Sequence, residues 1–244
     1  MATQSGEMAV GLFDLLGFKA LIEDHEHRLD ELRHRVISAM ASAIDEARRT
    51  RAYAGSGQLG SSLFSDTLFL WIPTTSDCGA TDTVERMCVI ASLLLSRFME
   101  AGLPIRGAVA VGECTASIDQ PGETGLPATI LLGRPVVDAY ELERAQEWSG
   151  AALCSSAAIH LEHPPKWPAH LHPIVHYPPP LKESFERRFG GSARLSVRYF
   201  PDGRTLDVAN LIPKAKEGPS YPSAEKKRQE TIRFYQYCVG ATQS

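Results

Sequence analysis

Residues 8–18 read MAVGLFDLLGF and set the pattern for the start of the chain. The first six, Met8 to Phe13, form a continuous apolar run, which is typical of a buried strand. The run breaks at Asp14 and passes through Gly17, a residue that marks tight turns. Apolar residues then recur at helical spacing from Lys19 to Arg49, with charged residues between them. We therefore predict a buried strand that feeds one long helix through an acidic, glycine-containing turn.

The middle of the chain alternates between strand-like and helix-like segments. An aromatic and β-branched run over residues 63–72 is interrupted by a polar corner at Ser65-Asp66, which predicts two strands joined by a turn. Amphipathic segments predict two helices, and short apolar segments predict further strands. The helices are expected at Thr81–Ala101 and Pro135–Gln146, and the strands at Leu103–Gly112, Ile130–Leu132 and within Gly150–Ile159. This order favours a mixed α/β (α+β) sandwich with helices flanking the sheet.

The last third of the chain differs in composition. His160–Pro180 is rich in histidine and proline and predicts a long structured loop. Leu195–Ile212 predicts a hairpin around the turn tripeptide Pro201-Asp202-Gly203. A closing helix is expected at Ala224–Cys238. We therefore predict a core over residues 8–160 and a C-terminal extension over residues 161–244, consisting of loop, hairpin and helix, that packs on the same domain.

Composition excludes several classes of protein. The chain has 244 residues, 43% of them hydrophobic, and a formal charge of -4, which argues against a nucleic-acid binder because such proteins carry a basic excess. No apolar run reaches the roughly 18 residues that a membrane span needs, and the N-terminus lacks a signal-peptide pattern. The five cysteines are scattered without CxxC spacing, which is typical of reduced thiols. These features predict a cytoplasmic protein without nucleic-acid or membrane partners.

Two acidic turns and one arginine form a candidate site for metal ions and phosphate. Asp14 follows the first strand, Asp66 lies at the polar corner, and Arg106 interrupts a third apolar strand. Two carboxylates at neighbouring strand ends can hold Mg²⁺ or Mn²⁺ while phosphates complete the shell. The backbone N–H groups of Leu16, Gly17 and Phe18 could bind an anion at the start of the helix. The alternative is structural: a helix cap, a hairpin corner and an ion pair.

The ordered motifs resemble those of class III nucleotidyl cyclases. The segments are Phe13-Asp14-Leu15-Leu16-Gly17-Phe18, then Ser65-Asp66, Arg106-Gly107, and Gly133-Arg134-Pro135-Val136-Val137-Asp138-Ala139; Leu12 stands where the family's first motif has phenylalanine. The resemblance implies that Asp14, the backbone of Leu15 and Asp66 bind two Mn²⁺ or Mg²⁺ ions per site. It also implies that Arg106 contacts the triphosphate and that the turn residues Phe13, Leu16, Gly17 and Phe18 contact the nucleotide.

A finer resemblance is to the bacterial pyrimidine cyclases of Pycsar antiphage systems. It rests on Pro104-Ile105-Arg106-Gly107-Ala108 and on Ala139-Tyr140-Glu141-Leu142-Glu143 through Gln146-Glu147-Trp148-Ser149-Gly150-Ala151. Familiar purine cyclases carry Asn and Arg where this chain has Val137 and Glu141. Their purine-reading Lys and Asp fall near Ser62 and Ile130. These departures fit a changed base specificity, with UTP as the expected substrate and CTP as the alternative, or a non-catalytic nucleotide-binding or dimerisation module.

The resemblance also implies a mode of action. The enzyme would be a homodimer with its sites at the interface, and it would release pyrophosphate and a cyclic nucleotide, most readily cyclic UMP. That second messenger would activate a separate effector protein in phage defence and lead to abortive infection. Arg134 and Arg144 are candidates for the missing transition-state arginine, with solvated surface residues as the alternative.

Two other features have competing interpretations. Tyr53 could stack on a pyrimidine base or belong to the core or an interface. The histidines of the His160–Pro180 loop suggest zinc, but no cysteine or acid lies at the usual ligand spacing. We therefore expect no zinc site in this loop.

Overall fold

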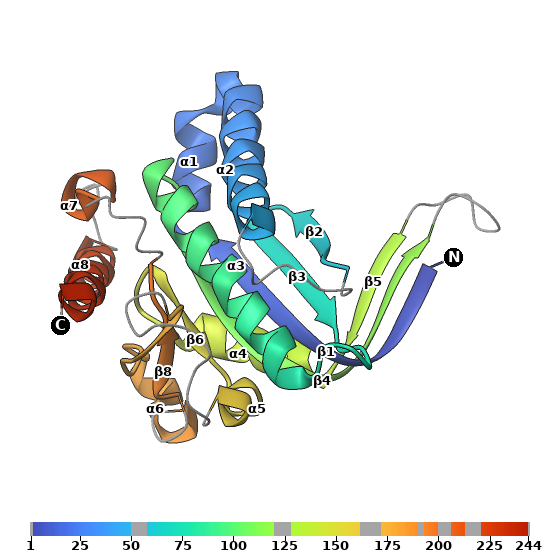
Figure 1. Cartoon of the computed structure of the whole chain (residues 1–244). Helices are drawn as coiled ribbons and strands as arrows, with labels where there is room; N and C mark the ends of the chain where they lie inside the picture. The colour runs from blue at the N-terminus through green and yellow to red at the C-terminus, as the bar shows by residue number, and fades with distance from the viewer. Residues whose placement is uncertain are drawn as a thin grey trace.

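The computed structural model describes residues 2–49, 58–119, 128–161, 172–189, 193–199, 206–212 and 221–243. Its centre is an eight-stranded sheet with the order β2-β3-β1-β4-β6-β8-β7, in which β5 pairs with β4 outside this path. The strands are β1 (Ala2–Leu15), β2 (Gly60–Phe64), β3 (Thr67–Pro73), β4 (Ile105–Asp119), β5 (Ala128–Gly133), β6 (Gly150–Leu153), β7 (Ile174–His176) and β8 (Leu195–Val197). Pairing is antiparallel except between β4 and β6. The predicted mixed sheet with flanking helices is confirmed (Figure 1).

Side chains of β1 alternate between the two faces of the sheet, as the period of a strand requires. Ala9, Phe13 and Leu15 belong to the large core cluster, whereas Leu12 belongs to a second cluster on the other face. The same alternation in β4 puts Ile105 with the large cluster. Asp14 and Arg106, at the intervening positions, therefore share the face of the smaller cluster.

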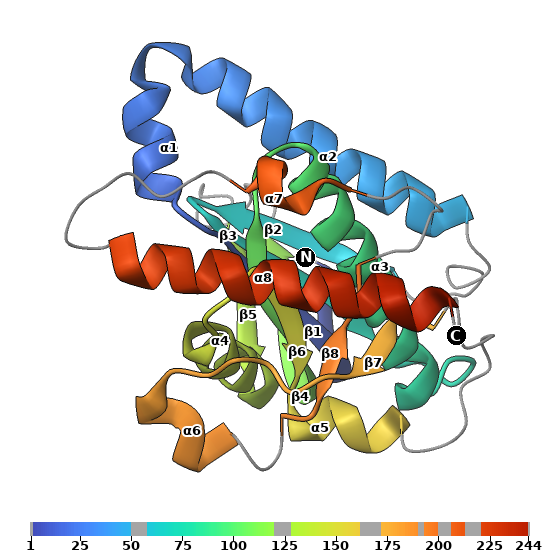
Figure 2. The same cartoon turned by 90° about the vertical axis from the view of Figure 1, so that its left-hand side faces the viewer.

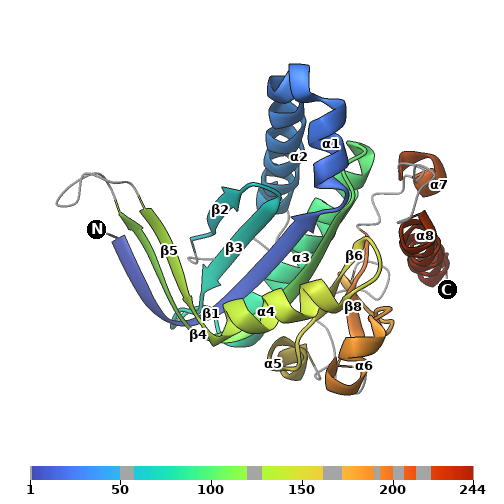
Figure 3. The same ribbon diagram turned by 180° about the vertical axis from the view of Figure 1, so that it is seen from behind.

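Helices cover both faces. On one face lie α2 (Leu29–Arg49) and α3 (Ala80–Glu100), which bury their apolar stripes in the large core cluster. On the other face lies α4 (Arg134–Ala145), which contributes Ala139 and Leu142 to the smaller cluster and crosses the sheet opposite α3 (Figure 3). The predicted helices at Thr81–Ala101 and Pro135–Gln146 are confirmed as α3 and α4. Within the described residues, no helix is long and apolar enough to cross a membrane.

The C-terminal residues add to the same sheet. Strand β8 pairs with β6 and β7, and α8 (Tyr221–Gln243) runs alongside this end of the molecule (Figure 2). An aromatic cluster holds α8 in place: the ring centroids of Trp148 and Phe234 are 4.3 Å apart. The short elements α5 (Ser155–Ala158), η3 (Ile159–Leu161), α6 (Glu183–Phe189) and α7 (Val208–Leu211) complete this region. The boundary between core and extension at residue 160 stays a prediction.

The single long helix expected at Lys19–Arg49 is wrong. The structure has α1 (Phe18–Asp24), a 3-10 helix η1 (Glu26–Arg28) and then α2. His25 breaks the helical geometry with φ -118 and ψ 19. Residues 23–28 are all polar or charged, so no apolar side chain anchors this stretch to the core and the chain changes direction there (Figure 2).

The hairpin expected at Leu195–Ile212 is also wrong. Its first half forms β8, but its second half forms the helix α7, because Asp207 caps it and accepts a hydrogen bond from the backbone N–H of Asn210. The partners of β8 are β6 and β7 instead. The turn tripeptide at 201–203 lies outside the described residues. The loop expected at His160–Pro180 contains the short strand β7, and its residues 162–171 are likewise outside the described part.

Candidate functional site

Strand register brings Asp14 and Arg106 together. Asp14 of β1 is the direct pairing partner of Arg106 in β4 and of Thr67 in β3. Because paired residues project to the same face of a sheet, the carboxylate and the guanidinium meet, and Asp14 Oδ2 lies 3.6 Å from Arg106 Nη2. On the opposite face Gly107 lets the Phe13 ring pack against β4, since a Cβ there would lie 2.2 Å from that ring.

Asp66 reaches the same end of the sheet through the turn between β2 and β3. Ser65 adopts the left-handed conformation, with φ 56, and tightens this turn. The backbone N–H of Leu15 donates to the carbonyl of Asp66 across 3.0 Å. The turn is therefore tied by its backbone to the residue that follows Asp14. The two aspartates are close enough for the charge of Asp66 to raise the pKa of Asp14.

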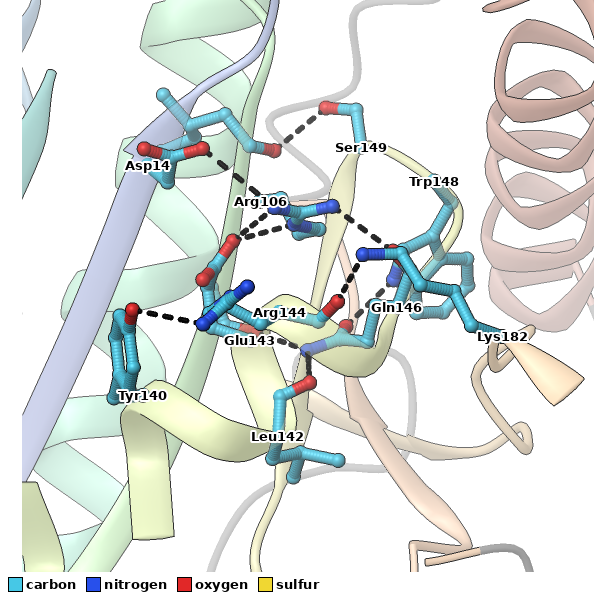
Figure 4. A network of polar contacts seen from close by, with 12 residues as sticks. Asp14, Arg106, Tyr140, Leu142, Glu143, Arg144, Gln146, Trp148, Ser149 and Lys182 are labelled. Carbon is cyan, nitrogen blue, oxygen red and sulfur yellow. Dashed lines mark hydrogen bonds and ion pairs between the residues drawn. The ribbon is translucent and has the colours of Figure 1, made fainter. Parts of the chain in front are cut away.

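Arg106 is held from several sides. Its Nε donates to Glu143 Oε1 across 2.5 Å, its Nη2 also pairs with Glu143, and its Nη1 donates to the carbonyl of Gln146 across 2.9 Å (Figure 4). Glu143 is buried, with 3% of its side chain exposed. The guanidinium is thus fixed beside Asp14 in one orientation.

The end of α4 is fixed by a second set of buried bonds. The side-chain amide of Gln146 donates to the carbonyls of Gly107 and Leu142, at 2.8 and 3.0 Å. Its oxygen accepts from the Trp148 indole at 2.7 Å. Ser149 Oγ donates to the carbonyl of Ile105 at 2.7 Å. These bonds lock the turn from α4 to β6 against β4, and with it the carbonyl that holds Arg106.

Asp14 is partly buried and surrounded by uneven charge. Burial and then the negative charge of Glu143 raise the pKa of Asp14 from 3.8 to about 6, while Arg106 opposes the rise. Burial also raises the pKa of Glu143, again opposed by Arg106. Ionised Asp14 therefore sits in an environment with too little positive charge. A divalent cation between Asp14 and Asp66 would correct this, so these hard oxygen donors fit Mg²⁺ or Mn²⁺.

The protein alone supplies few ligands to such a cation. Among the residues that the structure describes, no three His, Cys, Asp or Glu side chains gather to hold a metal. Asp14, Asp66 and the carbonyl of Leu15 would thus need the oxygens of a phosphate ligand to complete the shell. The expectation about zinc in the His160–Pro180 loop stays a prediction, because residues 162–171 lie outside the described part.

The raised pKa of Asp14 leads to a prediction about protein stability that can be tested without an activity assay. Below about pH 4 the residue is protonated in both folded and unfolded chains; between pH 4 and 6 only the folded chain holds the proton. Stability is therefore lost as pH rises to 6. We expect Asp14→Asn to stabilise the metal-free protein at pH 8 by about 1–2 kcal/mol, allowing for partial exposure, and to have little effect at pH 4. Thermal melts in EDTA measure this. A less stable Asp14→Asn protein at pH 8 would show that the Arg106 attraction dominates.

The remaining residues of the first turn are placed as follows. The Phe13 ring is buried in the core at 1% exposure. The N–H of Leu16 donates to the carbonyl of Pro104 at 2.9 Å, so the expectation that this amide is free for an anion is wrong. Gly17 adopts φ 74 and precedes α1, which begins at Phe18. Tyr53 lies outside the described residues.

Of the four positions expected to differ from purine cyclases, two are exposed and two are partly buried. Val137 and Ile130 are exposed, and Ser62 lies in β2 opposite Phe69. Glu141 forms an ion pair with Arg188 of α6, with Oε1 3.0 Å from Nη1. It therefore ties α4 to the C-terminal residues.

The two candidate arginines have partners on their own helix. Arg134 pairs with Asp138 at 2.8 Å, and Arg144 donates to the Tyr140 hydroxyl at 3.1 Å and lies over its ring. Neither contacts Asp14 in this arrangement.

Sequence analysis missed Glu143 and Gln146 as parts of the site. One signal was available: Glu143 is four residues after Ala139, on the stripe that α4 buries. A carboxylate within an apolar stripe is rare unless it is paired, and Arg106 is the partner. Gln146, at the end of the helix, gave no comparable signal because its bonds go to backbone carbonyls brought together by the fold.

Several solved structures share this fold. An adenylyl cyclase from P. aeruginosa, CyaB, is 17% identical and matches 84% of this chain and 98% of its own, with a TM-score of 0.56. The guanylyl cyclase Cya2 is 12% identical over 85% of this chain and 100% of its own, with a TM-score of 0.53. The catalytic core of a rhodopsin-guanylyl cyclase with converted specificity, solved with ATPαS, is 13% identical over 82% and 99%, with a TM-score of 0.56.

These likenesses establish the architecture. The chain has the class III nucleotidyl cyclase fold. No protein-family profile and no curated protein sequence matches it.

Proposed function

We propose that this protein is a class III nucleotidyl cyclase that converts a nucleoside triphosphate into a 3′,5′-cyclic monophosphate and pyrophosphate. The observation that carries this proposal is the meeting of Asp14, Asp66 and Arg106 at one end of β1, β3 and β4. On this fold, two carboxylates and the fixed guanidinium of Arg106 suit a polyphosphate that carries divalent metal ions. The structural alternative, a cap and an ion pair, does not account for a second carboxylate, Asp66, whose charge adds to the raised pKa of Asp14.

The chain's own residues would mainly position the reactants. In the reaction the ribose 3′-oxygen attacks the α-phosphorus and the bond to pyrophosphate breaks. Two divalent cations, Mn²⁺ or Mg²⁺, would when bound supply a lower pKa for the 3′-hydroxyl and offset charge on the phosphates. Asp14, Asp66 and the Leu15 carbonyl would hold them. Arg106, fixed by Glu143 and Gln146, places a preorganised positive charge beside the phosphates.

For the base we propose a pyrimidine, with UTP as the substrate and CTP as the alternative. The support is chemical: the positions near the purine readers of other cyclases carry Ser62 and Ile130, neither of which is charged. Glu141, at the position of a transition-state arginine, is engaged by Arg188. The resemblance to Pycsar cyclases favours uridine. By that resemblance, cyclic UMP would be a second messenger in antiphage defence that activates a separate effector and leads to abortive infection.

We also propose a homodimer with its sites at the interface. Large apolar side chains stand exposed on β2, β5 and α4. Phe64 is 79% exposed and Leu132 66%, and Val137 and Tyr140 of α4 are close to half exposed. Exposed apolar side chains of this size support the proposal that another chain covers part of this surface. A second copy is the partner that a symmetric cyclase site requires.

The experiment is to incubate the purified protein with each of the four nucleoside triphosphates and Mn²⁺, and to separate the products by mass. We expect cyclic UMP and pyrophosphate, with cyclic CMP as the alternative. A cyclic purine product would keep the cyclase and reject the pyrimidine proposal. If a properly folded dimer binds nucleotide but yields no product with Mn²⁺ or Mg²⁺, the protein is a binding module, as the loss of Asn and Arg at Val137 and Glu141 would then explain.

A further inference from the structure

Two lysines from the C-terminal residues lie within electrostatic range of Arg106. Lys182 follows a stretch that runs beside the end of α4: the N–H of Lys182 donates to the carbonyl of Ala145 at 2.7 Å, and that of Glu147 donates to Pro180 at 2.8 Å. The ammonium of Lys182 donates to the carbonyl of Arg144, within the network around Arg106 (Figure 4). Its charge therefore stands at the edge of the candidate site.

Lys227 is brought to the same place by the docking of α8. The neighbouring Lys226 pairs with Glu147. One turn later Thr231 accepts a hydrogen bond from the N–H of Ser149 at 2.7 Å, and it lies on the same side of the helix as Lys227. These two contacts flank Lys227 in the sequence and dock this part of α8 against the turn between α4 and β6, whose Gln146 carbonyl holds Arg106.

Electrostatics supports this placement. Burial lowers the pKa of Lys182, and the positive charges of Arg106 and Lys227 lower it further. Burial and the charge of Arg106 likewise lower the pKa of Lys227. Glu143 is taken by Arg106 and Glu147 by Lys226. Within the described residues no salt bridge joins Lys182 or Lys227 to a carboxylate, so neither ammonium group is committed to a counter-charge and both can turn to a phosphate beside Arg106.

We propose that Lys182 and Lys227 form, with Arg106, a polyphosphate-binding subsite built within one chain. It would hold the terminal phosphates of the nucleotide and the departing pyrophosphate, while Asp14 and Asp66 serve the cations. Lysine suits this role as a mobile point charge with several donors. Arg106 contributes a charge that is fixed in place, and Lys182 and Lys227 contribute charges on flexible side chains. The inference rests on the proposed function for its biological meaning, but the subsite binds phosphate by its own chemistry.

The test is calorimetric titration of the full-length protein with tripolyphosphate, with and without Mg²⁺. We expect Lys182→Met and Lys227→Met each to weaken binding about tenfold, since each removes one charge-assisted contact. Lys227→Arg should restore most of the affinity. Lys226→Met is the matched control: it removes the same charge from the adjacent position of α8, yet its ammonium already pairs with Glu147, so we expect less than about a twofold change.

Thermal melts accompany the titrations. Both lysines are partly buried and are repelled by the charge of Arg106. Removing their charge should therefore leave the melting temperature unchanged or raise it, so a loss of binding can be told from a loss of folding. The proposal is overturned if the wild-type protein does not bind tripolyphosphate, if both variants bind as the wild type does, or if Lys226→Met is equally weakened. If the protein is an active cyclase but tripolyphosphate binding does not depend on the lysines, the subsite proposal alone is rejected. If tripolyphosphate binding depends on the lysines but the protein has no turnover, the cyclase proposal alone is rejected.

Discussion

Asp66→Asn is expected to lower the rate of cyclic nucleotide formation by about 10³-fold or more while the protein stays folded. Asparagine lacks the negative charge that holds a divalent cation, and metal assistance is the largest contribution to the proposed reaction. The fold survives because the contact from Leu15 to Asp66 uses the backbone carbonyl, which asparagine retains. The measurement is product formation with Mn²⁺ across a range of metal concentrations.

Asp77→Asn is the matched control for this prediction. Asp77 also lies at a turn next to β3, and its carboxylate accepts a hydrogen bond from Ser76 at the surface. The same chemical change there should leave turnover within about twofold of the wild type. If Asp66→Asn keeps more than a tenth of the wild-type rate at saturating Mn²⁺, Asp66 is not a metal ligand and the turn between β2 and β3 has only a structural role.

The sequence was informative about the site because strand ends are visible in it. Asp14 and Asp66 follow apolar runs, and Arg106 interrupts one, so each could be placed at the end or on a face of a strand. Their meeting depends on register, in which Asp14 is paired with Arg106 across strands 92 positions apart in the chain. No local pattern encodes that pairing; the resemblance to cyclase motifs supplied it.

The rest of the site depends on contacts between distant segments. Lys182 and Lys227 come from parts of the chain whose local pattern is a loop and a basic surface helix. The docking of α8 through Thr231 brings Lys227 within electrostatic range of Arg106. The errors in the fold have the same origin. The long helix breaks at His25 because its polar stretch finds no core to pack on, and β8 finds β6 as a partner instead of a neighbour in sequence.

Glu143→Ala is expected to destabilise the protein by about 3–5 kcal/mol, because it leaves the buried guanidinium of Arg106 without its counter-charge. Glu143 is 3% exposed and pairs with both Nε and Nη2 of Arg106, whose side chain is 9% exposed. For a chain of this size the loss corresponds to a fall in melting temperature of about 10 °C. Urea unfolding at pH 7.5 measures the free energy. Glu147→Ala, which breaks the more exposed pair with Lys226, should cost about 1 kcal/mol or less.

A second variant separates the structural role of this ion pair from its role in the site. Replacing both partners, as Arg106→Met with Glu143→Leu, removes the unpaired charge and should recover most of the stability lost in Glu143→Ala, since buried pairs exchanged for apolar residues of similar size are often neutral. Turnover should not recover, because the fixed charge beside Asp14 is gone. If the double variant regains turnover, Arg106 serves only to hold α4 against β4 and the phosphates depend on Lys182 and Lys227. If Glu143→Ala alone is as stable as the wild type, water reaches Arg106 and the guanidinium is free to bind ligand directly.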